Sequence, residues 1–227
     1  KTINEKSIIK NTLLYTNLGL NYELETLGSI DELRQIQNKF EFSRKISNST
    51  QLSFLLTPTA NFQHNLDFSD VSLLGSFEIH HELNSRTTLN IGAARTSIFG
   101  NPKLLPIASL NYDISENANL LIGFPDSKIS YSNNIRNTFS LNNSFNGSFY
   151  NLDAQNYLNK KAEKAALSQM TTAFEYERNV EKNWFLNFKA GYDFDKKYKL
   201  TDSRDHTVYD FNVSRGYVLG IGIKYKQ

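Results

Sequence analysis

Side chains with reactive groups are sparse in this sequence, and one candidate group surrounds a histidine. His80 lies between Glu78 and Glu82, and Ser76 precedes them at the same even-numbered spacing. A hydrolase needs a serine nucleophile, a histidine base and a polar group that orients the histidine. Alternate residues of a strand share a face but lie roughly 6–7 Å apart, so this spacing does not bring them into contact by itself. We therefore interpret His80 as a member of a polar network, with a hydrolase as the alternative.

A second group of polar side chains lies near the C-terminus. His206 occurs there together with Asp202, Asp205 and Asp210. Carboxylates and an imidazole can bind a cation, but the same residues are common in ordinary polar loops. The loop interpretation is the one we predict, with a surface cation site as the alternative.

The composition excludes several other classes of site. The chain has no Cys, so disulfides, thiol catalysis and Cys-ligated zinc are excluded. It has only 4 His, so we do not expect a multi-histidine metal site. The glycines occur singly or alternate within strand-like segments, and no phosphate-binding glycine-rich loop is present. The formal net charge of +2 argues against a general nucleic-acid binder. We expect no cofactor, no metal ion and no nucleic-acid partner.

Alternation of apolar and polar residues with a period of two runs through most of the chain. It is clearest from Trp184 to Phe194, where every even position is apolar and most odd positions are not. This pattern is typical of a strand that separates an apolar environment from a polar one. In the first such segment, Leu14 and Leu18 are expected to face the apolar side and Tyr15 the polar side. The chain is therefore predicted to be all-β.

The predicted architecture is an up-and-down antiparallel β-barrel of twelve strands, with ten as the alternative. The strands run to roughly 12–15 residues, whereas a globular strand has about 5–6. Tight polar turns alternate with longer connections, as in outer-membrane barrels. The count depends on Pro125–Asp126, expected to turn, and on Lys128–Ser132, expected to form a short strand. The one helix-like segment, Leu158–Ser168, is expected to decorate the longest loop, and the whole chain is expected to be one domain.

The few charged residues on the apolar faces favour a transmembrane barrel over a soluble one. Arg44 and Arg178 fall near the predicted short turns, and His64 and Arg95 near the longer loops. A charge costs about 2–4 kcal/mol at the bilayer midplane and little at the interface, so a membrane would enforce this placement. Both termini of such a barrel lie on the periplasmic side, and roughly the first ten residues are expected to be a periplasmic extension. We expect that a signal peptide has been removed.

A set of short motifs occurs between about residues 90 and 150: Ile91-Gly92, Phe99-Gly100, Leu105-Pro106, Leu110-Asn111-Tyr112, Phe124-Pro125 and Ile129-Ser130-Tyr131. With these motifs the segment resembles an uncharacterised outer-membrane β-barrel family of Bacteroidota. The resemblance implies the barrel fold and an outer-membrane location, but no activity and no site residues. One departure is the end of the sequence, Tyr225-Lys226-Gln227, where such barrels often end in an aromatic residue.

The inward face is predicted to carry charges of both signs. Mixed signs favour a salt-bridged, filled lumen, because an ion-selective pore tends towards one sign at its constriction. Several apolar residues are also expected to point inward: Leu55, Leu74, Leu105, Ile107 and Leu121. The predicted lumen charge network consists of Lys39, Glu41, Glu78, His80, Glu82, Glu175, Lys189 and Asp193.

These patterns predict a non-enzymatic structural or accessory subunit of a larger cell-envelope complex. Its partners would be the lipid bilayer of the outer membrane and other outer-membrane proteins, the latter through the lysine-rich segment Asn159–Lys164. A small passive channel for polar solutes is the first alternative, in which Glu78 or Lys39 would set ion selectivity. An outer-membrane lipid hydrolase centred on His80 is the second.

Overall fold

A computed structural model describes residues 2–4, 6–22, 30–153, 162–211, 213 and 215–225, most of which lie in β-strands. The only helical element among them is the 3-10 turn η1 (Phe68–Asp70). The strands are β1 (Thr2–Asn4), β2 (Ser7–Tyr22), β3 (Ile30–Lys45), β4 (Thr50–Phe62), β5 (Val71–Asn84), β6 (Thr87–Thr96), β7 (Lys103–Ser115), β8 (Ala118–Phe124), β9 (Asp126–Asn134), β10 (Asn137–Asn151), β11 (Lys164–Glu181), β12 (Trp184–Thr201), β13 (Thr207–Phe211) and β14 (Gly216–Tyr225).

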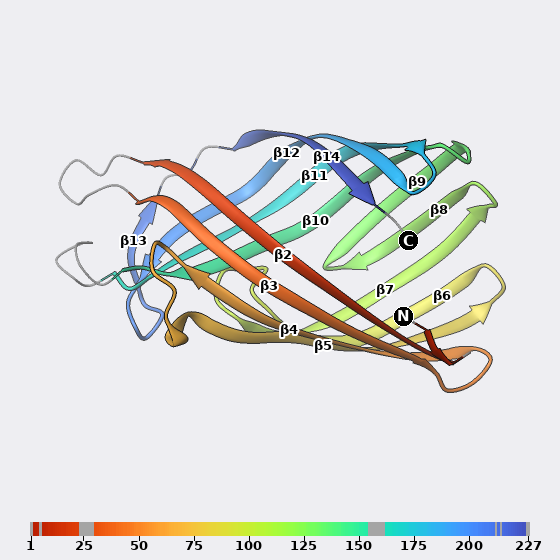
Figure 1. The fold of residues 1–227 in the computed structure, drawn as a ribbon, viewed down its shortest axis with the longest axis horizontal. Coiled ribbons are helices and arrows are strands. Elements are labelled where there is room, and N and C mark those ends of the chain that lie inside the picture. The colour runs from red at the N-terminus through yellow and green to blue at the C-terminus, as the bar shows by residue number, and fades with distance from the viewer. Residues whose placement is uncertain are drawn as a thin grey trace.

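The strands form one up-and-down antiparallel sheet in which each strand pairs with the next (Figure 1). β13 and β14 both pair with β12 along successive parts of its length, so together they occupy one strand position. With β2 to β12 this gives twelve antiparallel strands, as predicted. The turn at Pro125 and the short strand after it are also confirmed, since β9 occupies Asp126–Asn134.

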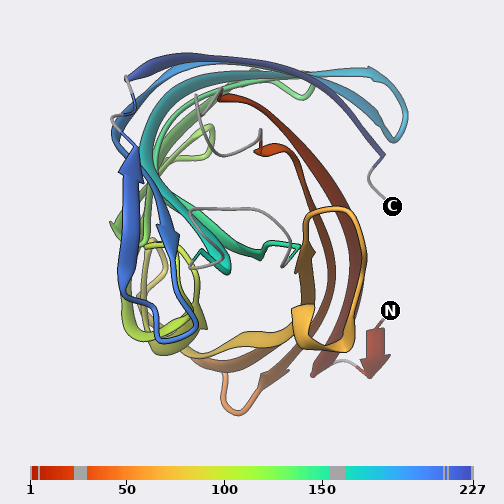
Figure 2. The ribbon, with the colours of Figure 1, turned by 90° about the vertical axis from the view of Figure 1, so that its left-hand side faces the viewer.

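The sheet curls into a barrel-like wall that is not closed. Within the part of the chain that the structure describes, one edge is β2 with the short β1 paired to its start, the other edge is β13 and β14, and no pairing joins β2 to β14. Figure 2 shows the gap between these edges, which we call the seam. The short turns lie at one end of the wall, the turn end, and the longer connections lie at the other, the loop end (Figure 1).

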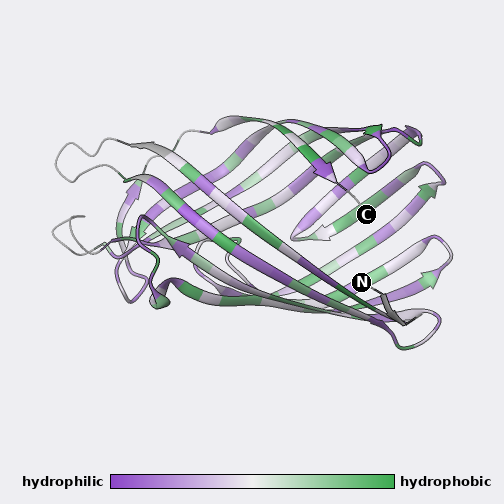
Figure 3. Cartoon of the chain, in the orientation of Figure 1, coloured by the Kyte–Doolittle hydropathy of each residue, from purple (hydrophilic) through white to green (hydrophobic). Residues whose placement is uncertain are grey.

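Apolar side chains cover the outside of the wall, and polar ones line the inside. Figure 3 shows this alternation along each strand. The outward side chains include Phe54 and Phe77, which are 49% and 37% exposed although the centroids of their rings lie only 4.8 Å apart. The most exposed row lies on β14, where Tyr217, Leu219 and Ile221 are 88%, 83% and 77% exposed. The outer face is therefore largely apolar, whereas the inner face carries most of the polar side chains of the strands.

The predicted facing of the first long strand is wrong. Tyr15 pairs with Ile36 on the outward face, whereas Leu14 pairs with Gln37 on the inward face. Leu18 likewise faces inward, opposite Leu33. Large apolar residues occur at both odd and even positions of this strand, so alternation alone did not distinguish its two faces.

Two further expectations are corrected by strand boundaries. β2 begins at Ser7, so part of the expected N-terminal extension belongs to the sheet. Lys164–Ser168, expected to be helix-like, lie in β11, while residues 158–161 fall outside the described residues. Pairing with β10 and β12 on both sides outweighs the helix propensity of this segment.

The largest buried apolar cluster lies inside the wall at the loop end. Its members come from β3 on one side of the lumen and from β10 to β13 on the other, so the cluster bridges the interior. Leu18, Leu167 and Val213 pack against it. We call this cluster the apolar plug; its buried members are Ile30, Leu33, Tyr150, Leu152, Ala162, Ala165, Tyr198, Leu200 and Phe211.

The loop-end parts of β10 and β11 contribute to the plug, and β10 also contacts the opposite side of the wall. The end of β10 lies close to β4. The Asn151 side-chain amide donates hydrogen bonds to the Ser69 carbonyl and to the Asp70 carboxylate, each at 3.0 Å. The Asp153 backbone N–H donates to Gln63 Oε1 at 3.3 Å. These hydrogen bonds join the end of β10 to η1 and to the end of β4 across the loop end.

Candidate functional site: the lumen and its apolar plug

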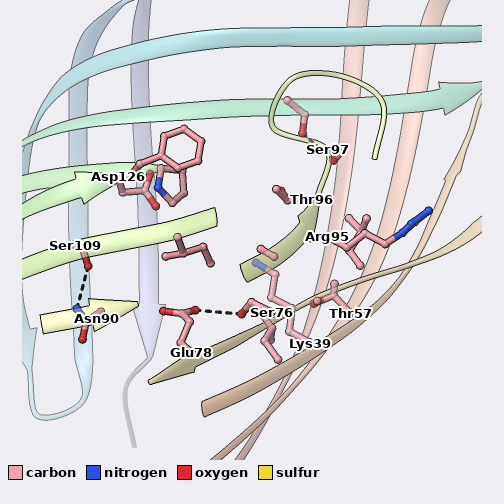
Figure 4. Close-up of a pocket in the computed structure, with 18 of the residues that line it drawn as sticks. Lys39, Thr57, Ser76, Glu78, Asn90, Arg95, Thr96, Ser97, Ser109 and Asp126 are labelled. Carbon is pink, nitrogen blue, oxygen red and sulfur yellow. Dashed lines mark hydrogen bonds between the residues drawn. The ribbon is translucent and has the colours of Figure 1, made fainter. Parts of the chain in front are cut away.

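The lumen below the plug contains a cavity of about 460 Å³, the central cavity. Leu55, Leu74, Ile107 and Leu121 form apolar parts of its wall, which confirms their predicted inward direction. Its polar residues come from β3 to β7 and β9, and Figure 4 shows Lys39, Ser76 and Glu78 at this cavity, with Arg95 directed away. The cavity is therefore of mixed polarity, like many small-molecule sites.

The predicted lumen charges face inward but form separate local pairs. Lys10 Nζ contacts Glu41 Oε1 at 3.1 Å, and Lys189 Nζ lies 4.0 Å from Glu175 Oε1. The Asp193 carboxylate accepts a hydrogen bond from Thr171 Oγ1 at 2.7 Å. Each pair joins neighbouring strands, so these contacts stabilise the register of the strands, and the paired side chains fill part of the space inside the wall.

The remaining members of the predicted set lie on β3 and β5. Glu78 Oε1 accepts a hydrogen bond from Ser76 Oγ at 3.1 Å. For Lys39 the structure gives no ion-pair partner among the described residues, and the same holds for Glu82. Lys39 and Glu82 line cavities on the inward face, where solvent can reach their charged groups.

His80 contacts a different polar chain from the one a hydrolase would need. Its Nδ1 lies 2.6 Å from Asn90 Oδ1, and Asn90 Nδ2 donates to Ser109 Oγ at 2.9 Å. Ser76 is bonded to Glu78 instead, so the structure does not bring a serine nucleophile to His80. This arrangement agrees with a histidine in a structural network across β5, β6 and β7.

The polar residues near His206 build a turn. Asp202 Oδ1 accepts hydrogen bonds from the backbone N–H groups of Arg204 and His206, each at 2.9 Å. The hydrogen bond from the His206 backbone is the main reason that the pKa of Asp202 lies below its usual value. Asp205 instead accepts from Lys164 Nζ at 2.9 Å, and Asp210 lies 2.9 Å from Lys199 Nζ. Asp202 and Asp210 thus make contacts within the hairpin of β12 and β13, whereas Asp205 joins this hairpin to the start of β11.

The described residues also lack two other features. They contain no group of three or more His, Cys, Asp or Glu side chains placed to hold a metal ion. They also contain no helix that is long and apolar enough to span a membrane.

Comparison of the whole chain with known proteins gives a family. The model of a domain of unknown function, DUF6268, matches residues 4–226, nearly the whole chain. The chain belongs to the DUF6268 family. No curated protein matches the chain, and no solved structure does. Membership of DUF6268 confirms the expected assignment to an uncharacterised family, and it adds no substrate, partner or site residue.

The feature of this DUF6268 chain that sequence reasoning missed is the plug. Its members lie at the loop ends of strands that are far apart in the sequence, such as β3 and β12. The sequence did carry a signal, because Leu33 and Leu200 are apolar residues that lie between polar ones in their strands. Assigning it required the inward face of each strand, which β2 shows can be misassigned.

Proposed function

We propose that the chain is an integral outer-membrane β-barrel without enzymatic activity, acting as an accessory subunit of a larger envelope complex. The observation that carries this proposal is the inverted surface: exposed apolar side chains outside and polar pairs inside. A transmembrane barrel has this arrangement because lipid contacts its outer face and its lumen is polar. The sequence resemblance described above supports the same location and is the basis for proposing a source in the Bacteroidota.

The positions of outward charges support the bilayer assignment. Arg44 and Arg178 lie within the turn-end parts of β3 and β11, and Arg95 lies within the loop-end part of β6. Between these levels the outward rows of β4, β5 and β14 carry no charged side chain. A bilayer would span the apolar rows and leave the charges at its two interfaces.

The plug supports an accessory role over a channel. It occupies the lumen at the loop end with side chains such as Leu33 and Leu200, which are 0% exposed. Hydrophobic constrictions exclude water and ions even when they are not fully closed. A passive channel for polar solutes stays the second candidate, because the central cavity beneath the plug has room for small solutes. The lysine-rich segment expected to contact partners lies mostly outside the described residues.

Isolation of the tagged full-length protein from native membranes in mild detergent tests this proposal. We expect it in the outer-membrane fraction, accompanied by at least one stoichiometric protein that mass spectrometry identifies. The matched control is the same preparation from cells that carry only the tag on an unrelated outer-membrane barrel. A lone barrel that conducts ions in planar bilayers would favour the channel instead, and recovery in the aqueous fraction would contradict both.

A further inference from the structure

We infer that the seam is a lateral entrance to a binding site for a single-chain amphiphile with an anionic head group. This inference rests on the proposed bilayer location, because such a ligand would enter from the lipid. It concerns a second cavity of about 570 Å³, the seam cavity, which lies directly below the plug. Its volume falls in the usual range for small-molecule sites, about 300–1,000 Å³.

The seam cavity has an apolar side and a polar side. Leu18, Tyr150, Leu167 and Tyr198 line it at the loop end, where they also belong to the plug or pack against it. Gln169, Asp193 and Lys196 line it towards the middle of the lumen. A ligand that fills both sides must itself be apolar at one end and polar at the other.

The polar side offers a cation for an anionic head group. Lys196 is half-buried and has no ion-pair or hydrogen-bond partner among the described residues. Its neighbour Lys197 is already paired, with Nζ 2.9 Å from Asp195 Oδ2. The nearby Asp193 carboxylate is held by Thr171 Oγ1 at 2.7 Å. Lys196 is therefore the group that a carboxylate or phosphate ester would contact, by a charge-assisted hydrogen bond.

The two edges of the seam both reach this cavity. Leu18 of β2 and Val218 of β14 line it from opposite edges, and neither strand pairs across the gap. β2 runs towards the loop end and β14 away from it, so the edges are antiparallel (Figure 1). If Leu18 lies opposite Val218 when the seam closes, Tyr15 lies opposite Ile221. Closure in this register satisfies the edge backbone groups in lipid, and opening exposes the cavity to the bilayer.

Binding of a fluorescent fatty acid, cis-parinaric acid, to the protein in phosphatidylcholine nanodiscs tests the site. We expect saturable binding above the signal of protein-free nanodiscs, and displacement by oleate or by lysophosphatidylglycerol. Displacement by oleate alone identifies a fatty acid as the ligand, and displacement by lysophosphatidylglycerol identifies a phosphate-bearing lipid. Either result supports the inference, whereas no saturable binding overturns it.

Matched variants assign the site to its residues. Lys196→Gln is expected to weaken binding about tenfold, because it removes the charge from the head-group contact. The control Lys199→Gln, on the same strand but outside the lining of the cavity and already paired with Asp210, is expected to change affinity by less than about twofold. Val218→Trp, which fills the cavity, is expected to abolish binding. Unchanged affinity in both Lys196→Gln and Val218→Trp overturns the inference.

A disulfide lock tests the entrance. The chain has no Cys, so Tyr15→Cys with Ile221→Cys gives a single possible bridge across the closed seam. Oxidation is expected to slow entry of the probe at least about tenfold, and reduction is expected to restore it. Tyr15→Cys with Tyr217→Cys lies out of this register and is the control that should not cross-link. An unchanged entry rate in the locked protein overturns the lateral entrance. The heat-modifiable mobility of each variant shows separately whether the barrel has formed. A failure of the proposed function can therefore be distinguished from a failure of the lateral entrance.

Discussion

Replacement of Phe77 by arginine is expected to destabilise the protein in a phospholipid bilayer by about 2–4 kcal/mol. Phe77 lies on the outward face near the middle of β5, and it pairs with Phe54. Under the proposed function its side chain contacts the centre of the bilayer, where a guanidinium has no polar partner. Equilibrium unfolding in urea, measured on protein folded into phospholipid vesicles, gives the difference in unfolding free energy.

Leu83→Arg is the matched control for this prediction. Leu83 is on the same strand and the same face, is 53% exposed, and lies at the turn end. Its replacement is expected to cost only about 0–1 kcal/mol, because arginine at an interface reaches water and head groups. Equal costs at the two positions would show that no depth-dependent environment surrounds the outward face, and would count against a membrane-spanning wall.

Removal of apolar surface from the plug is expected to open the lumen. Leu33 and Leu200 are both 0% exposed and come from opposite sides of the interior. We expect the wild-type protein to give no resolved current in planar bilayers, and the Leu33→Ser, Leu200→Ser variant to raise the conductance at least about tenfold. The physical reason is that hydroxyl groups and the space left by the leucines let water enter a constriction that was dry.

The plug variant needs a check that its barrel still forms, since a buried leucine truncated to a small residue costs about 2–5 kcal/mol. Heat-modifiable mobility on gels provides this check before each recording. Leu104→Ser, at an outward position that is 75% exposed, is the control and should leave the current unchanged. A wild-type current as large as that of the plug variant would be inconsistent with a sealing role and would favour the channel.

The fold could be predicted from the sequence because strand length and alternation are local properties. The strand count depended on one short segment, and the turn at Pro125 was sufficient to place β9. The inward direction of Leu55, Leu74, Ile107 and Leu121 followed from the same period of two. These successes share one cause, namely that each face of most strands meets a single kind of environment.

The site could be predicted only in part, because its contacts depend on how distant strands meet. Leu14 and Leu18 face inward, and Leu18 packs against the plug, so β2 has apolar residues on both faces and its facing was misassigned. The partners of the inward charges depend on register, as with Lys10 and Glu41 on adjacent strands. The open seam depends on whether β2 and β14 pair with each other, and this is not a local property of either strand.

The proposed location depends above all on contact between the outward face and lipid, and nitroxide accessibility measures this contact most directly. Single cysteines can be placed without removing any native one, at outward Ile122 and Phe174 and at inward Gln37 and Ser109. In phospholipid vesicles, the outward labels are expected to be relaxed by oxygen and shielded from a water-soluble nickel chelate, and the inward labels to show the opposite preference. If the nickel chelate relaxes the outward labels as strongly as the inward ones, water surrounds the outer face and the membrane assignment is wrong.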